Sequence, residues 1–143
     1  MKITSNHQQS ILLVDDIPHI LELNHEVLSD EGYQLTKVTS GESAIEALEK
    51  KHFDMVITDL NMGKVSGLKV LKRAKELHPG IKTIITTGNT DIQYAIEALR
   101  LHADDYILKP FRVYSLVEKV ADCFTPFGKN NKTNCPECEV SCN

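Results

Sequence analysis

Short β-branched apolar runs alternate along this chain with segments whose apolar residues recur every three or four positions. The runs predict strands buried on both faces of a parallel sheet, and the segments between them predict amphipathic helices. The predicted strands cover residues 11–15, 34–38, 55–59, 83–87 and 105–108. The predicted helices cover residues 18–29, 42–48, 68–77, 92–99 and 113–123. This alternation predicts a doubly wound α/β domain with strand order 2-1-3-4-5.

The chain has the size and composition of one globular domain with short polar ends. Its 143 residues are 41% hydrophobic and 25% charged, with a formal net charge of −4. Nothing in this balance favours direct binding of nucleic acid or of an anionic membrane. No apolar run has the length of a membrane span, and the first residues lack the apolar stretch of a signal peptide. We expect a cytoplasmic protein with a polar leader at 1–9, a domain at 10–124 and a flexible tail at 125–143.

Side chains that suit phosphate or a divalent metal stand where the predicted strands end. They are Asp15 and Asp16 after the first run, Asp59 after the third, Thr87 after the fourth and Lys109 after the fifth. In an open sheet of this kind, ligands bind outside the carboxyl ends of the strands, so these side chains are expected in one crevice. Three crowded carboxylates repel each other unless a hard cation such as Mg²⁺ is held between them. Lys109 and Thr87 would complete a phosphoryl-binding site.

Each of these residues also has a purely structural explanation. Adjacent acids at a strand-to-helix junction are common helix N-caps, and Thr87 and Lys109 are ordinary residues for strand ends. Asp59 is harder to explain in this way, because a carboxylate that closes a buried strand loses hydration unless something pairs with it. The combination favours one phosphoryl and metal site over several independent structural roles.

The same residues carry a resemblance to a known family. The motifs occur in order, each at a strand end: Asp15-Asp16, Asp59, Thr87-Gly88 and Asp105-Tyr106-Ile107-Leu108-Lys109-Pro110-Phe111. Over about residues 10–124 the chain resembles the receiver domain of two-component response regulators, which has a flavodoxin-like (βα)5 fold. The resemblance implies that Asp59 accepts a phosphoryl group from a sensor histidine kinase or a phosphotransfer protein of a phosphorelay.

The resemblance also implies roles for the neighbouring residues. Asp16, Asp59 and the backbone carbonyl of Asn61 would hold Mg²⁺, with Mn²⁺ as a substitute, and Asp15 would act through water. Lys109 would contact the phosphoryl oxygens, and its bond to Pro110 is expected to be cis. Thr87 and Tyr106 would form a conformational switch. The switch would change the surface of 92–101, 105–108 and 113–123, which is the expected interface with a downstream protein or a second copy of the chain.

The chain stops soon after the predicted last helix, so we expect a stand-alone regulator without a DNA-binding or enzymatic output domain. Such a protein is a phosphoacceptor that catalyses only its own phosphorylation and dephosphorylation, and it is not otherwise an enzyme. One departure from the family pattern is His102, which stands where a glycine commonly ends the fourth helix. A glycine there would allow positive φ. We expect a cap of different geometry that spares His102 this conformation.

Two other functions stay open on the sequence. Phosphohydrolases of the haloacid dehalogenase type use Asp, Thr and Lys on a similar sheet, but they need a second Asp where this chain has Asn61. The tail carries Cys135, Cys138 and Cys142, a spacing that suits zinc or an iron–sulfur centre, although a closed site needs four ligands. A metal- or redox-responsive tail on a receiver scaffold is therefore the alternative function. We favour a flexible tail with free thiols.

Overall fold

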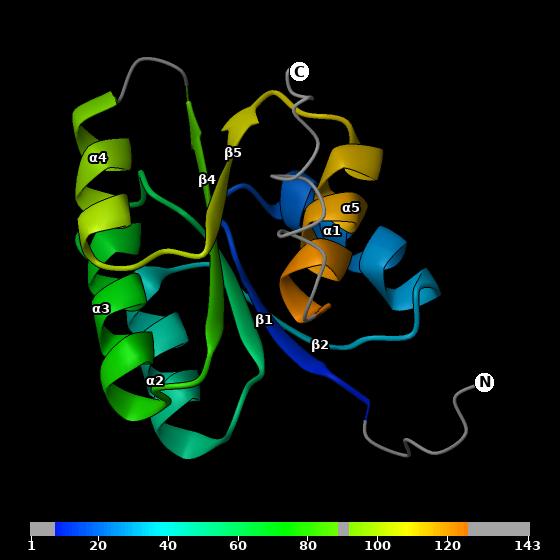
Figure 1. Cartoon of the computed structure of the whole chain (residues 1–143), viewed down its shortest axis with the longest axis horizontal. Coiled ribbons are helices and arrows are strands. Elements are labelled where there is room, and N and C mark those ends of the chain that lie inside the picture. The colour runs from blue at the N-terminus through cyan, green and yellow to red at the C-terminus, as the bar shows by residue number, and fades with distance from the viewer. Residues whose placement is uncertain (1–7, 89–91, 126–143) are drawn as a thin grey trace.

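The computed structural model describes residues 8–88 and 92–125, which form a five-stranded parallel sheet between two layers of helices (Figure 1). The strand order is β2-β1-β3-β4-β5, and all four strand pairs are parallel. The strands are Ser10–Val14 (β1), Gln34–Val38 (β2), Met55–Asp59 (β3), Lys82–Gly88 (β4) and Asp105–Lys109 (β5). The predicted doubly wound fold and its strand order are confirmed.

The helices are divided between the two faces of the sheet. They are Pro18–Asp30 (α1), Gly41–Lys50 (α2), Gly67–Leu77 (α3), Ile92–Arg100 (α4) and Val113–Phe124 (α5). Figure 1 shows α2, α3 and α4 on one face and α1 and α5 on the other. Each strand end on the carboxyl side is therefore followed by a loop that leads to one of these two layers, and those loops surround the crevice where the predicted site residues lie.

The core is continuous through the central strands because their side chains alternate between two apolar layers. Every residue of β1 and β3 is buried. On β1, Ile11 and Leu13 pack toward α1 and α5, whereas Leu12 and Val14 pack toward α2 and α3. This burial on both faces is the reason that the strands are unbroken apolar runs in the sequence. It also fixes the strand ends that carry the functional side chains.

Two expectations of local structure are corrected. The first strand ends at Val14, so Asp15 lies in the loop after it, where its carboxylate accepts a hydrogen bond from the Ile17 backbone N–H at 3.0 Å. His102 has φ = +70°, so the expectation that a different cap would spare it positive φ is wrong. The backbone needs the left-handed conformation after α4, because the Ala103 N–H turns back to bond the Ala98 carbonyl at 3.0 Å.

Two further expectations concern a membrane-spanning helix and the cysteine tail. None of the helices in the described ranges is both long enough and apolar enough to cross a bilayer. Cys135, Cys138 and Cys142 lie outside the described residues, and so does the segment 89–91 before α4.

Candidate functional site

The carboxyl ends of β1, β3 and β5 bring three charged side chains into contact. Asp15 follows β1 and Asp59 ends β3, and these two strands are neighbours in the sheet. Lys109 ends β5, and its long side chain reaches past β4 to both acids. Its Nζ lies 3.1 Å from Asp15 Oδ2 and 3.2 Å from Asp59 Oδ2. One ammonium thus bridges two carboxylates that are nearly excluded from solvent, at 4% and 5% exposure.

Asp16 adds a third carboxylate to the same crevice. An oxygen from each of Asp15, Asp16 and Asp59 lies within 4.8 Å of the others. Asp15 and Asp59 are buried, whereas Asp16 is exposed to solvent. Lys109 pairs with Asp15 and Asp59, and Asp16 adds a third carboxylate beside them, so the described part of this crevice has more negative than positive charge.

The close approach of these charges shifts the pKa values of Asp59 and Lys109. Burial raises the pKa of the Asp59 carboxyl above its ordinary value, and the charge of Asp15 raises it further, while Lys109 opposes both effects. For Lys109 burial alone would lower the pKa of the ammonium, but the Asp59 and Asp15 carboxylates raise it above its ordinary value. The two carboxylates therefore favour the charged form of Lys109, whereas burial disfavours the ionised form of Asp59.

The donor set fits a divalent cation with oxygen ligands. Mg²⁺ is bound in proteins by one or two carboxylates, with retained waters and phosphate oxygens filling the other positions. Clustered oxygens from Asp15, Asp16 and Asp59, open to solvent on the Asp16 side, supply this kind of partial shell. The excess negative charge is the physical reason that a cation would bind here.

The backbone around Asp59 is held from two sides. The Asn61 N–H donates to Asp59 Oδ1 at 3.4 Å, and the Leu60 N–H donates to the Thr86 carbonyl of β4 at 3.0 Å. Gly67, the first residue of α3, packs directly on this strand end, because a Cβ there would overlap the Asp59 carbonyl oxygen and lie 2.8 Å from Leu60 Cα. Sequence reasoning missed Gly67. A glycine immediately after the Ser66 N-cap was the only available signal.

Of the two proposed switch residues, Thr87 is buried and Tyr106 is partly exposed to solvent. Thr87, at the end of β4, is buried at 1% exposure, and its hydroxyl donates to the Gly88 carbonyl at 3.1 Å. The Tyr106 side chain on β5 is 39% exposed. The bond between Lys109 and Pro110 is cis, as expected. The structure thus brings Asp15, Asp16, Asp59 and Lys109 together, places Thr87 at the neighbouring strand end and leaves Tyr106 outside the crevice.

Comparison with known proteins identifies the class that this fold and site define. Residues 11–121 match the model of the response regulator receiver domain, and the chain belongs to this family. Receiver domains are signalling modules of two-component systems: they accept a phosphoryl group from histidine kinases and are not enzymes in the usual sense.

Individual relatives agree with this assignment. The chain is 36% identical over 124 residues to the response regulator SaeR of Staphylococcus epidermidis, covering 87% of this chain and 54% of SaeR. It is 32% identical to the probable transcriptional regulatory protein TcrX of Mycobacterium tuberculosis, covering 76% of this chain and 46% of TcrX. The chain therefore spans about half the length of these relatives.

Solved receiver structures have the same fold. A CheY-like response regulator receiver domain protein from Methanospirillum hungatei matches with a TM-score of 0.78 at 29% identity, covering 81% of this chain and 93% of that one. The receiver domain of NtrX from Brucella abortus matches with a TM-score of 0.73 at 30% identity, covering 79% of this chain and 96% of that one.

Proposed function

We propose that the chain is a response regulator receiver that is phosphorylated on Asp59 in a Mg²⁺-dependent reaction. The observation that carries this proposal is the bridge from Lys109 to Asp15 and Asp59, beside the further carboxylate of Asp16. Asp59 suits the role of acceptor because its Oδ1 and Oδ2 lie between the Asn61 N–H and the Lys109 ammonium. Both donors can stabilise charge on an adjacent phosphoryl group.

The cation would be held by Asp16, Asp59 and the backbone carbonyl of Asn61, with Asp15 acting through water. When bound, Mg²⁺ supplies charge neutralisation for the phosphoryl oxygens. Mn²⁺ prefers the same oxygen ligands and would substitute for it.

In the proposed reaction an Asp59 oxygen attacks the phosphorus of a phosphohistidine or of acetyl phosphate. The new O–P bond makes an acyl phosphate, and the bond from phosphorus to the leaving group breaks with its electron pair going to that group. Lys109, positively charged and within 3.2 Å of Asp59 Oδ2, would contact the transferred phosphoryl oxygens. The Asp59 carboxylate must be ionised to attack, so its raised pKa makes labelling weaker in acid.

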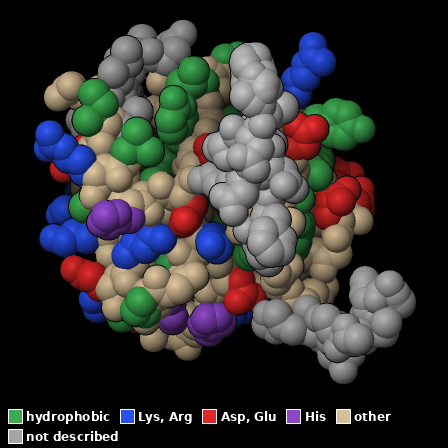
Figure 2. Space-filling view, in the orientation of Figure 1, with side chains coloured by type: hydrophobic (Ala, Val, Ile, Leu, Met, Phe, Trp, Pro, Cys, Tyr) green, Lys and Arg blue, Asp and Glu red, His purple; other side chains and the backbone are tan. Residues whose placement is uncertain are grey.

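The output would pass through the face formed by α4, β5 and α5. Thr87 would exchange its bond to the Gly88 carbonyl for a phosphoryl oxygen, and Tyr106 would turn inward as it moves. Several large apolar side chains of these three elements are exposed: Ile96, Leu99, Tyr106, Leu108 and Tyr114. Figure 2 shows hydrophobic side chains at the surface over α4. A surface of this kind suits a protein partner or a second copy of the chain.

The test is intact-mass spectrometry after incubation with acetyl phosphate, with and without Mg²⁺. We expect one phosphoryl adduct on the wild type in Mg²⁺, and none after chelation. Asp59→Asn should show no adduct, because an amide oxygen is a poor nucleophile. The matched control is Asp30→Asn, an exposed acid at the end of α1, which should be labelled like the wild type.

Labelling of Asp59→Asn, or of the wild type without a divalent cation, would contradict the proposal. Steady release of phosphate from an ester substrate would instead point to a phosphohydrolase. An unlabelled wild type, under conditions that label a control receiver, would leave the cysteine tail as the alternative to test.

A further inference from the structure

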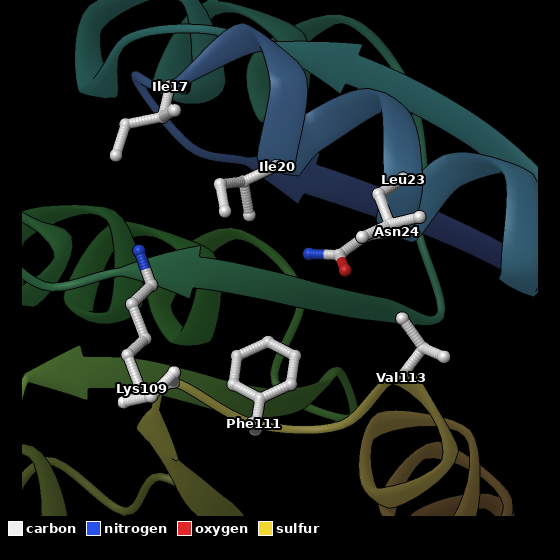
Figure 3. A pocket seen from close by; sticks show the side chains of 8 residues that line it. Ile17, Ile20, Leu23, Asn24, Lys109, Phe111 and Val113 are labelled. Atoms are coloured by element: carbon white, nitrogen blue, oxygen red, sulfur yellow. The ribbon is translucent and has the colours of Figure 1, made fainter.

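Two histidines and an aspartate line a hollow at the amino end of the sheet, opposite the phosphoacceptor crevice. The groove in Figure 3, between α1 and the loop after β5, is lined by Lys109 and so adjoins that crevice. The hollow at the amino end, of about 310 Å³, lies where residues 51–54 before β3 meet residues 78–81 before β4. His52, Asp54 and His78 are among its lining residues. The proposed phosphorylation uses none of these three side chains.

The imidazole rings of His52 and His78 lie close together and nearly perpendicular to each other. Their centroids are 5.3 Å apart, and their planes cross at 86°. Two imidazoles that bind one tetrahedral metal ion, each through a nitrogen at about 2.0 Å, have ring centroids about 5 Å apart. The two rings therefore already have the separation that a shared ion requires.

Each ring is oriented by a hydrogen bond through its Nε2 atom. His78 Nε2 lies 2.9 Å from the Leu48 carbonyl oxygen, and because a carbonyl oxygen can only accept, the ring hydrogen is on Nε2. His52 Nε2 likewise donates to Asp54 Oδ1 at 3.2 Å. In this tautomer Nδ1 of each ring carries a lone pair. A hydrogen bond from the other ring nitrogen to a carboxylate or a backbone carbonyl is also what orients metal-ligating histidines in proteins.

The backbone holds the two loops together, and the hollow is open to solvent. The Asp54 N–H donates to the Ser10 carbonyl at 2.8 Å, and the Lys82 N–H donates to the Asp54 carbonyl at 3.0 Å. The side chain of His52 is 67% exposed, so an ion can enter and keep water ligands on its open side. The rings are thus fixed before an ion arrives, which lowers the cost of binding it.

We propose that His52 and His78 together bind one divalent transition-metal ion of the zinc type through their Nδ1 atoms. Imidazole suits Zn²⁺, Cu²⁺ and Ni²⁺, whereas Mg²⁺ prefers oxygen ligands. This site and the carboxylate crevice therefore select different ions. Two histidines and water make a weaker site than the closed four-ligand site of a structural zinc. The proposal does not rest on phosphorylation of Asp59.

The test is titration of Zn²⁺ into the ¹⁵N-labelled full chain in excess Mg²⁺, followed by imidazole and amide nitrogen shifts. Every sample carries Cys135→Ser, Cys138→Ser and Cys142→Ser, so that thiolates do not compete for the ion. We expect saturation below about 1 mM Zn²⁺, with Nδ1 of His52 and Nδ1 of His78 responding along one curve. Mg²⁺ alone should leave both rings unchanged.

Substitutions identify the ligands. His52→Gln and His78→Gln should each weaken Zn²⁺ binding at least about tenfold, because each removes one of two protein ligands. The matched control is His19→Gln, at an exposed position of α1, which should bind like the parent chain. Asp59→Asn should also bind Zn²⁺ at the histidines, so failure of the phosphorylation proposal would be seen separately.

The inference is overturned if neither ring responds over that range of Zn²⁺, as expected for an edge-to-face ring contact without affinity for metal. Saturation of the two rings at clearly different concentrations would overturn it too, because it would mean two independent single-histidine sites. Unchanged affinity in either of the glutamine variants at His52 and His78 would have the same consequence.

Discussion

Aspartates lie at both ends of the sheet, but the balance between carboxylates and positive charges differs between the two ends. At the amino end, Asp104 Oδ2 accepts hydrogen bonds from the Thr83 N–H at 2.8 Å and from Lys75 Nζ at 3.1 Å. Asp54 Oδ2 likewise accepts from the Ser10 N–H at 2.8 Å. Here each carboxylate has backbone donors and joins neighbouring elements of the fold. At the carboxyl end, Asp15 and Asp59 also accept one backbone N–H each, but they share a single ammonium, that of Lys109, and Asp16 adds a third carboxylate beside them.

The difference teaches how to separate a structural acid from a functional one in an unfamiliar parallel sheet. A carboxylate whose charge is matched by its own donors and a cation, as Asp104 is by the Thr83 N–H and Lys75, stabilises the fold. A cluster whose negative charge exceeds its donors lowers stability, and is retained only where a cation or a reaction requires it. Substitutions at the two ends should therefore change stability with opposite signs.

The largest effect is expected at Gly67, which lets α3 approach the strand end that carries Asp59. In Gly67→Ala the new methyl group would overlap the backbone of Asp59 and Leu60, and we expect the free energy of unfolding to fall by about 3 kcal/mol. Urea unfolding measures it. The control is Gly63→Ala, where nothing lies within 4 Å of the added Cβ and the change should stay within about 0.5 kcal/mol. Equal, small effects would mean that α3 can move away from Asp59.

The next largest effect should come from the amino end. Asp104→Ala removes the acceptor of the Thr83 N–H and the partner of Lys75, and we expect a loss of about 2 kcal/mol. Glu26→Ala, at an exposed position of α1, is the control and should change stability by less than about 0.5 kcal/mol. A neutral or stabilising Asp104→Ala would remove the contrast between the two ends.

Much of this arrangement could be predicted from the sequence because parallel strands place their carboxyl ends at one edge. Asp59 and Lys109 lie 50 positions apart, yet each closes a strand, and that alone predicts their proximity. The apolar runs of β1 and β3 were recognisable because burial on both faces leaves few polar residues.

The remaining features depend on tertiary contacts that no local pattern reveals. Gly67 is needed because the backbone at the end of β3 lies against it, and this contact is known only once the fold is formed. The expectation for His102 was wrong because local preference disfavours positive φ for histidine, whereas the turn from α4 into β5 demands it.

A gain of stability is expected from Asp59→Asn, of about 1 kcal/mol near neutral pH without divalent cations. The pKa of Asp59 is raised in the folded state, so the folded protein holds its proton more tightly than the unfolded chain does. The wild type is therefore penalised as the pH rises from the unfolded value of about 3.9 through the folded one. Thermal unfolding from pH 3 to pH 8 should show the gain appearing over that interval. Added Mg²⁺ should stabilise the wild type more than the variant, and a stability gain that is independent of pH would contradict the electrostatic explanation.

The smallest effect is expected at His102, which shows that the amino end also contains a locally unfavourable residue. Positive φ costs an L-residue about 1–2 kcal/mol, but a glycine gives back part of that by adding conformational freedom to the unfolded chain. His102→Gly should therefore stabilise by only about 0.5 kcal/mol, whereas His102→Ala keeps the unfavourable φ of +70° and should not stabilise. Urea unfolding of both variants separates backbone conformation from the loss of the imidazole, because only the former distinguishes glycine from alanine. Equal stabilisation by the two variants would assign the cost to the side chain and not to the turn.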